Sequence, residues 1–263
     1  MWLINRQNTT SVEHFLSNGF VGPIKIFNNE ECCKIEKYFN EMSTPEPADW
    51  YKGYAINDHF IYRLAIRPDI LKILKLLLGD NIILWGARLI TKKPGEIHAW
   101  HTDIECAQNS GSYATVWIGL SNCSKKTSLK LMSGSHKFNK NIQEIRYEKN
   151  LSRKKITDKE ITDIAGEFDK TSRLITPKIK DGEAIIFHGK IWHGSFNSSR
   201  ETRKALLFQY ASSDSIIRMP DFKQLDWPFI FKDYPLPPVL LISGTAPAGI
   251  NRLVPPPAPG TCN

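Results

Sequence analysis

From residue 81 onwards the chain is a series of short apolar segments separated by turns rich in glycine, proline and polar residues. These segments are rich in β-branched and aromatic residues, which favour strands. Short strands of this kind, with helices only at the front and in one insert, predict a mainly β protein with flanking helices whose core is a cupin-like jelly roll (a double-stranded β-helix). The predicted strands cover residues 81–91, 113–121, 129–132, 174–179, 184–187 and 203–210.

Helical spacing of apolar residues is found outside those strands. It predicts helices within residues 12–42 and over residues 69–78, where Gly79 follows as a stop signal. The charged stretch 138–172 predicts one or two further helices in an insert, which either shapes a substrate site or is a solvated excursion. Residues 43–58 are rich in proline, aromatic and polar residues and are expected to form a loop.

The length of 263 residues suits a single β domain, because sandwiches and barrels of this size occur undivided. We expect one domain over residues 1–263, with a helical N-terminal part at about 1–80 and a jelly-roll core at about 81–212. The insert 138–172 belongs to that core. The proline-rich tail at about 233–263 is expected to wrap the surface without forming a domain.

Composition predicts a cytoplasmic protein. No apolar run approaches the roughly 18 residues of a membrane span, and the start lacks the layout of a signal peptide. An odd number of cysteines without C-x-x-C spacing suits a reducing compartment. The cysteines are Cys32, Cys33, Cys106, Cys123 and Cys262.

The formal net charge of +8 is spread along the chain. No basic stripe is interleaved with aromatic residues in the way that suits nucleic-acid stacking, so nucleic acid is not expected as a partner. The charge remains compatible with a solvated lysine-rich surface or with an anionic small-molecule substrate. Basic residues in segments that could line a substrate pocket are Arg63, Arg67 and Arg218, and solvent-facing roles fit them equally.

The segment KKPGEIHAWHTD contains a candidate metal-binding pair, His101 and Asp103. Residues two apart on an extended segment point to the same side, so one imidazole and one carboxylate can reach the same ion. They are two of the three protein ligands of a non-haem iron facial triad. Alone the pair is a weak signal, because the chain has seven histidines.

His193 is the candidate third ligand, near the start of a late strand that a jelly roll can place beside His101. His188 is the alternative third ligand. If it does not bind the metal, it is expected to be a capping histidine or to lie next to the metal ligands. His193 is favoured because a serine, a polar turn and an arginine follow it.

The residues after His193 suit 2-oxoglutarate. Its distal carboxylate needs a protein anchor, and the planar fork of arginine can donate two parallel hydrogen bonds to a carboxylate. Arg203 begins a strand and is expected to point into the barrel, whereas Arg200 lies in the turn; both remain candidates. Ser195 lies on the same side as His193 and could donate a further hydrogen bond.

Four stretches together resemble the phytanoyl-CoA dioxygenase family of iron(II)/2-oxoglutarate-dependent oxygenases. They lie in the family's order within residues 70–212 and read KKPGEIHAWHTD, YATVWIGL, LKLMSGSHK and KDGEAIIFHGKIWHGSFNSSRETRKALLFQY. The resemblance implies iron(II) on His101, Asp103 and His193, with 2-oxoglutarate held by Arg203 and Ser195. It also implies that Trp117 lies near the co-substrate.

The implied enzyme is a dioxygenase that consumes molecular oxygen and hydroxylates an unidentified small molecule, while 2-oxoglutarate is converted to succinate and carbon dioxide. Asp103 supplies the carboxylate ligand that a related halogenase lacks, which makes hydroxylation the default expectation. Two other classes remain open. One is a non-catalytic jelly-roll protein that binds a small molecule, and the other is a cupin-type metalloenzyme that does not use 2-oxoglutarate.

Overall fold

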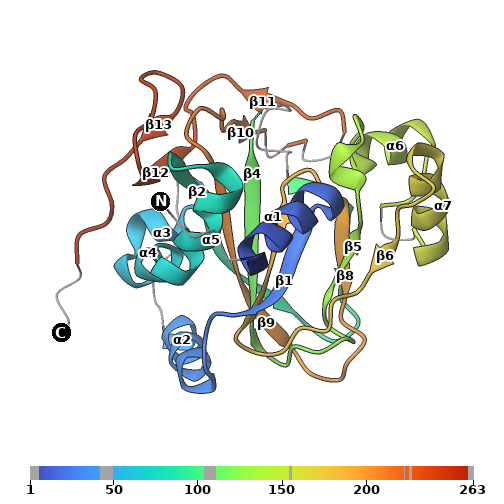
Figure 1. The fold of residues 1–263 in the computed structure, drawn as a ribbon, viewed down its shortest axis with the longest axis horizontal. Coiled ribbons are helices and arrows are strands. Elements are labelled where there is room, and N and C mark those ends of the chain that lie inside the picture. Colours follow the sequence, from blue (N-terminus) through green and yellow to red (C-terminus); the bar gives the residue numbers. More distant parts are fainter. Residues whose placement is uncertain are drawn as a thin grey trace.

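Two β-sheets lie face to face in this computed structural model, which describes residues 6–41, 50–103, 111–153, 156–221, 223–224 and 227–259. The large sheet has the order β1-β7-β4-β9-β2-β12-β13, and the small sheet has the order β3-β8-β5-β6 (Figure 1). The large-sheet strands are β1 (Phe20–Lys25), β7 (Glu183–His188), β4 (Tyr113–Ser121), β9 (Arg203–Ser212), β2 (Ile82–Lys92), β12 (Pro238–Ser243) and β13 (Arg252–Leu253). The small-sheet strands are β3 (Ile97–His101), β8 (His193–Phe196), β5 (Leu129–Met132) and β6 (Leu174–Ile175).

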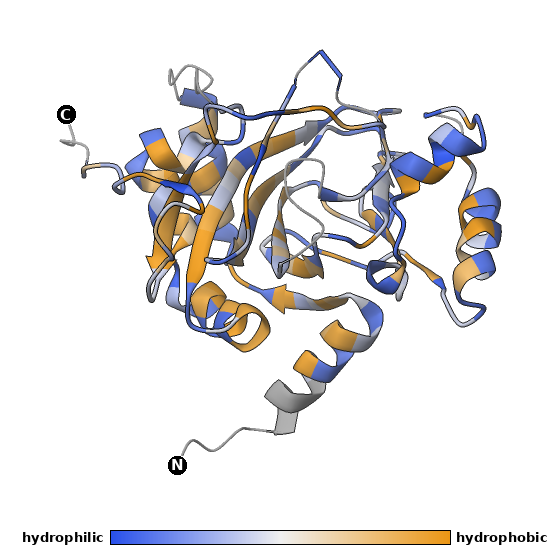
Figure 2. Cartoon of the chain, turned by 90° about the horizontal axis from the view of Figure 1, so that it is seen from above, coloured by the Kyte–Doolittle hydropathy of each residue, from blue (hydrophilic) through white to orange (hydrophobic). Residues whose placement is uncertain are grey.

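Alternation along β4 and β9 separates two apolar layers. Outward-facing residues such as Val116 and Phe208 pack under helices, whereas Trp117 and Ala205 face inward and pack against Leu129 of the small sheet. Figure 2 shows hydrophobic residues concentrated in the strands and hydrophilic residues in the surrounding loops. The two sheets and their shared interior confirm the predicted jelly roll.

Helices cover the outer face of the large sheet, on the side opposite the small sheet (Figure 1). They are α2 (Asn29–Glu41), α3 (Tyr54–Asn57), α4 (His59–Ala65) and α5 (Pro68–Leu78). The helix expected at residues 69–78 is confirmed: α5 has a proline in its first turn and ends at Gly79, whose φ of 83° suits glycine.

Residues 20–25 form an edge strand, β1, between α1 (Arg6–Asn18) and α2, although only helical spacing was expected within 12–42. The sequence hides this strand because Gly22 and Pro23 interrupt its apolar pattern. An edge strand tolerates proline, since one side of its backbone makes no ladder hydrogen bonds.

The insert contains two helices, α6 (Ile142–Glu148) and α7 (Asp158–Phe168), as the sequence predicted. Their apolar residues, including Ile145 and Ile161, pack against Trp100 and Trp192 on the outer face of the small sheet. Thr157 and Glu160 cap the start of α7 with reciprocal hydrogen bonds. The insert is therefore a packed layer over the small sheet.

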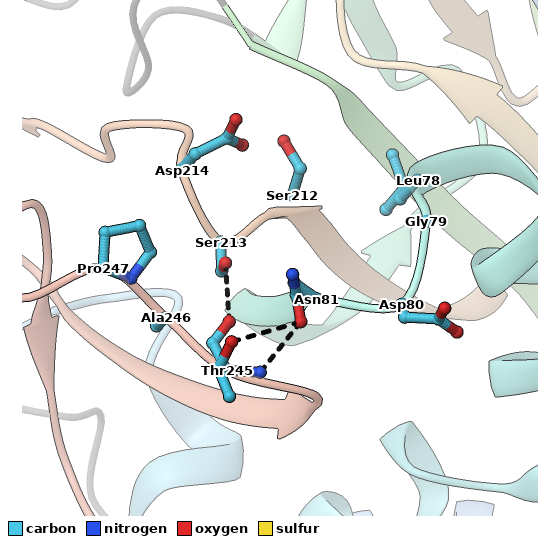
Figure 3. Close-up of a pocket in the computed structure, with 10 residues that line it drawn as sticks. All are labelled: Leu78, Gly79, Asp80, Asn81, Ser212, Ser213, Asp214, Thr245, Ala246 and Pro247. Atoms are coloured by element: carbon cyan, nitrogen blue, oxygen red, sulfur yellow. Dashed lines mark hydrogen bonds between the residues drawn. The ribbon is translucent and has the colours of Figure 1, made fainter.

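The tail differs from the expected surface wrap. Its strand β12 pairs antiparallel with β2 in the large sheet, and Val239 and Leu240 are buried there. Beyond β12, the Thr245 amide donates to the Asn81 side chain at 2.9 Å, and the Ser213 hydroxyl donates to the Thr245 carbonyl at 2.8 Å (Figure 3). These bonds hold the tail across a hollow at the end of the sheet.

Three smaller expectations also differ or fall outside the described residues. Tyr54–Asn57, within the expected loop 43–58, is helical, and residues 43–49 of that loop lie outside the described part, as do Cys106 and Cys262. The strand expected at 174–179 is only Leu174–Ile175.

A short pair, β10 (Met219–Pro220) and β11 (Phe231–Lys232), lies apart from both sheets. Among the described residues, no helix is long and apolar enough to span a membrane.

The burial of β12 predicts a stability contrast between two neighbouring leucines. Leu240 is 1% exposed and Leu241 is 36% exposed. Leu240→Ala should lower the free energy of unfolding by about 2–5 kcal/mol, because it opens a cavity in the core. Leu241→Ala, the matched control, should change it by about 0.5 kcal/mol or less. Equal effects in urea denaturation would show that β12 is not an integral strand.

Candidate metal centre

The three predicted metal ligands meet between the two sheets. Strands β3 and β8 run antiparallel, and their register places His101 directly opposite His193. Asp103 follows the end of β3, where its backbone N–H donates to the Gly189 carbonyl at 2.9 Å. Among the described residues, these three side chains form a group that could hold a metal ion.

The distances within the triad suit a single ion. The Nε2 atom of His101 lies 3.7 Å from Asp103 Oδ1, and the Nε2 atom of His193 lies 3.8 Å from the same oxygen. The ligand atoms all lie within 4.8 Å of one another. The two separations from Asp103 Oδ1 are shorter than twice a metal–ligand bond of about 2.0–2.2 Å, so one ion could bind Asp103 together with either histidine.

The backbone fixes which nitrogen of each histidine faces the site. His101 Nδ1 lies 2.8 Å from the Ala99 carbonyl, and His193 Nδ1 lies 3.0 Å from the Ile191 carbonyl. A carbonyl oxygen only accepts, so each Nδ1 carries the proton and each Nε2 presents a lone pair. This tautomer is the one that a metal-binding imidazole needs.

The Asp103 carboxylate is oriented from the large sheet. The Thr115 hydroxyl on β4 donates to Asp103 Oδ2 at 2.7 Å, which leaves Oδ1 facing the two histidines. Burial raises the pKa of Asp103, but the positive charge that surrounds it, including that of Lys52, and the hydrogen bond from Thr115 outweigh the effect of burial, so this pKa lies below its ordinary value. Burial lowers the pKa of His101, which favours the neutral imidazole. An anionic Asp103 carboxylate beside the neutral His101 imidazole is ready to bind a cation.

The segment between the ligands is held by the insert. The Gln143 side chain on α6 accepts from the Thr102 N–H and donates to the Thr102 carbonyl, both at 3.1 Å. This pair of bonds fixes the backbone between His101 and Asp103. The insert therefore contributes to the precision of the site, although Gln143 itself does not face it.

A cavity beside the triad contains every predicted co-substrate residue. Trp117 reaches it from β4, Ser195 from β8 and Arg203 from β9. Apolar side chains complete its wall. The lining residues are Ile90, His98, His101, Asp103, Trp117, Leu129, Phe187, His193, Ser195, Arg203 and Leu207.

Arg203 is 1% exposed, yet its Nε and Nη1 atoms have no hydrogen-bond partner within the described part of the chain. Its guanidinium lies over the Trp117 ring at 5.1 Å, and the Trp117 Nε1 atom also lacks a partner there. Burial lowers the pKa of Arg203, although its ordinary value is so high that it stays charged. Arg200, the alternative anchor, is exposed in the turn. The geometry thus presents Arg203 to an anion in the cavity.

His188 lies elsewhere. Its ring centroid is 5.3 Å from that of His136, and its Nδ1 accepts a hydrogen bond from the Lys190 N–H at 3.1 Å. Arg67 is also not available to a substrate, because it pairs with Glu31 at 2.8 Å and with Asp69 at 2.9 Å. Arg63 is exposed on α4, and Arg218 lies 4.6 Å from the Phe231 ring.

Sequence reasoning did not find three residues around the triad: His98, Lys52 and Thr115. A strict strand would put His98 and His101 on opposite faces, but β3 carries a bulge between them, so their rings lie 4.4 Å apart. Lys52 is 4% exposed and lies over the Trp85 ring at 4.9 Å. Thr115 could have been found, because its position two residues before Trp117 puts it on the same face.

Comparison with known proteins gives the family. The family model for phytanoyl-CoA dioxygenase (PhyH) matches residues 15–205, which is most of the chain. The chain belongs to this family. Among curated proteins, no sequence matches it significantly.

Solved structures share the fold at low sequence identity. The non-heme monooxygenase ThoJ is 16% identical with a TM-score of 0.62, covering 94% of this chain and 88% of that one. CytC3, solved with Fe(II) and alpha-ketoglutarate, is 20% identical with a TM-score of 0.61, covering 93% and 92%. The epimerase SnoN, solved with Fe3+, alpha ketoglutarate and nogalamycin RO, is 16% identical with a TM-score of 0.63, covering 94% and 98%. This PhyH-family chain therefore has the fold of non-heme oxygenases and related enzymes.

The hydroxyl of Thr115 gives a test of metal binding that leaves all three ligands in place. Thr115→Val should weaken iron(II) affinity about 10- to 100-fold, because Asp103 loses the bond that orients it. Competition with a chromogenic iron(II) chelator would measure the change. Thr127→Val is the matched control, since Thr127 is also buried but bonds to the Asn122 carbonyl in a distant turn. Equal affinities for both variants would contradict the role of Thr115.

Proposed function

We propose that this PhyH-family protein is an iron(II)- and 2-oxoglutarate-dependent dioxygenase that hydroxylates a small molecule. The observation that carries the proposal is the buried Arg203 guanidinium, whose Nε and Nη1 atoms have no partner in the described structure and which faces the same cavity as the triad. A buried cation needs a compensating anion. A dicarboxylate that also binds the metal supplies that anion.

The donor set fits iron(II). Two imidazoles and one carboxylate are the ligands of non-haem iron oxygenases, and they leave coordination positions for other molecules. His101, His193 and Asp103 would hold the ion through Nε2, Nε2 and Oδ1, since these atoms face one another. When bound, iron and 2-oxoglutarate supply the oxidising chemistry, in which molecular oxygen is consumed and 2-oxoglutarate becomes succinate and carbon dioxide.

The side chains that line the cavity suit 2-oxoglutarate. Its distal carboxylate would accept hydrogen bonds from Arg203, in a charge-assisted pair that arginine geometry favours. Ser195 and Trp117 lie in the same lining and bring a hydroxyl and an indole N–H. Apolar side chains such as Leu129 and Phe187 exclude water around these groups, which strengthens each polar interaction.

The same observations weigh against the other classes. A jelly roll that only binds a small molecule has no need of a buried facial triad. A cupin-type metalloenzyme that does not use 2-oxoglutarate has no need of Arg203. Hydroxylation is favoured because Asp103 retains the carboxylate ligand. The proposed substrate is a small molecule, with an anionic group compatible with the net charge of +8.

Succinate formation tests the proposed function. The wild type, given iron(II), ascorbate, oxygen and 2-oxoglutarate, should form succinate, and product analysis with an active substrate should show one added oxygen atom. Asp103→Ala should lower succinate formation by about 10²-fold or more, because the ion loses the only anionic ligand that the protein supplies. The control Asp80→Ala removes an exposed carboxylate and should behave as wild type. Absence of iron-dependent turnover and of 2-oxoglutarate binding in the wild type would refute the proposal.

Two arginines of the β8–β9 connection give a second test. Arg203→Met should weaken 2-oxoglutarate binding about 10- to 100-fold, since it removes a bidentate charge-assisted contact of roughly 1.5–3 kcal/mol. Arg200→Met removes an exposed charge from the same connection and should change the affinity less than two-fold or so. Calorimetric titration of the anaerobic iron(II) protein would measure both. A larger effect of Arg200→Met would show that Arg200, in the turn, is the residue that anchors 2-oxoglutarate.

A further inference from the structure

Gln209 is a buried polar side chain that the proposed reaction leaves without a role. It is 0% exposed, and within the described residues neither its Oε1 nor its Nε2 atom has a hydrogen-bond partner. Buried amide groups are nearly always paired with protein, water or ligand. A completely unpaired amide in a protein interior is therefore expected to pair with a ligand or with an ordered water.

The position of Gln209 is beside the metal centre. It lies on β9 on the same inward face as Arg203 and Leu207, because these residues are separated by even numbers of positions. On the neighbouring strand its register partner is Thr115, whose hydroxyl bonds to Asp103. Arg203 and Gln209 thus lie at different ends of one inward face, and Leu207 of the metal cavity lies between them.

Gly86 makes room for the Gln209 amide. The two residues are register partners between β2 and β9. A Cβ atom on Gly86 would lie 2.6 Å from Gln209 Oε1 and 3.2 Å from Gln209 Cβ. The amide therefore occupies the space that a side chain at residue 86 would fill, which explains a glycine inside a strand.

An aromatic cluster begins one residue away from Gly86, the register partner of Gln209. Trp85 precedes Gly86, is 2% exposed, and its Nε1 atom also has no partner among the described residues. It belongs to an apolar cluster with Trp50, Tyr113 and Ala211, and Ala211 is the next inward residue after Gln209. The positions next to Gln209 on β2 and β9 thus belong to an aromatic cluster that carries one further unpaired donor among the described residues.

We propose that Gln209 is a specificity-determining residue that contacts the organic substrate of the proposed dioxygenase, and that this substrate presents a flat neutral amide, such as an aryl carboxamide or a lactam. The inference rests on the proposed function. A primary amide offers both donors and an acceptor, so it is satisfied by a group that also has both. A substrate carboxylate would be repelled by the Gln209 Oε1 acceptor, because both groups carry negative charge density. A substrate ketone has no donor and would leave Oε1 unpaired.

Three probes of one size separate these chemistries: benzamide, acetophenone and benzoate. Their dissociation constants would be measured by calorimetry on the anaerobic protein, with and without iron(II) and 2-oxoglutarate. The wild type loaded with both should bind benzamide about five-fold more tightly than the other two probes, the gain expected from one additional satisfied hydrogen bond.

Two variants and a control assign that preference to Gln209. Gln209→Leu should abolish the preference, and Gly86→Ala should reduce it by displacing the amide, while the 2-oxoglutarate affinity of both stays within about two-fold of wild type. Gln224→Leu, which removes a surface amide bonded to the Pro228 carbonyl, should leave the preference intact. Gly86→Ala retains the Gln209 amide but displaces it, so this variant tests the position of the amide separately from its chemical identity.

Three outcomes would overturn the inference. Equal binding of the three probes by the wild type would show that the amide pairs with water, and a preference that survives in Gln209→Leu would place the contact elsewhere. Parallel loss of 2-oxoglutarate affinity in Gln209→Leu would assign the residue to the co-substrate. Failure of the proposed function gives a different pattern, because the wild type would then bind no 2-oxoglutarate whatever its preference among the probes.

Discussion

The antiparallel pairing of β3 with β8 is the constraint on which the rest of the site depends. It places His101 opposite His193, so that two candidate metal ligands from segments far apart in the sequence share one register. A slip by one residue would turn either histidine to the outer face, against Trp100 and Trp192. The packing of those two tryptophans under α6 and α7 therefore protects the register as well as the core. The insert stabilises the metal centre through this outer layer.

The interior between the sheets is mainly apolar and contains a few polar groups. Some of these groups are oriented by hydrogen bonds, and others have atoms without a partner. Backbone carbonyls fix the tautomers of both histidines, and Thr115 fixes the carboxylate of Asp103 from the opposite sheet. Arg203 and Gln209 are buried with polar atoms that have no partner in the described structure. Such atoms cost stability in a closed core and gain it back when a ligand pairs with them. Their positions on one face of β9 suit the proposal that co-substrate and substrate bind side by side.

Much of the fold and of the triad could be predicted, because both rest on local patterns. The β4 and β5 strands are short apolar runs between turns, the α5 helix has strong helical periodicity, and His-x-Asp followed by a distant histidine matches the order that the family resemblance implied. The edge strand β1 was hidden by Gly22 and Pro23. Strand β12 was hidden in a proline-rich tail, because pairing with β2 is a long-range property that no local pattern records.

The surroundings of the triad were harder to predict for a similar reason. His98 reaches the cavity only because a bulge shifts the face of β3, and bulges have no reliable sequence signal. Lys52 comes from a segment that composition marks as a loop, yet it is buried among aromatic rings. Choosing Arg203 over Arg200 required knowing which side chain is buried, since only two residues separate them in the sequence.

The most direct test of the central claim is an anaerobic crystal structure of the protein with iron(II) and 2-oxoglutarate. We expect the ion on Nε2 of His101, Nε2 of His193 and Oδ1 of Asp103, with the distal carboxylate of 2-oxoglutarate against the Arg203 guanidinium. An ion held by His188, or a co-substrate carboxylate that does not contact Arg203, would contradict it.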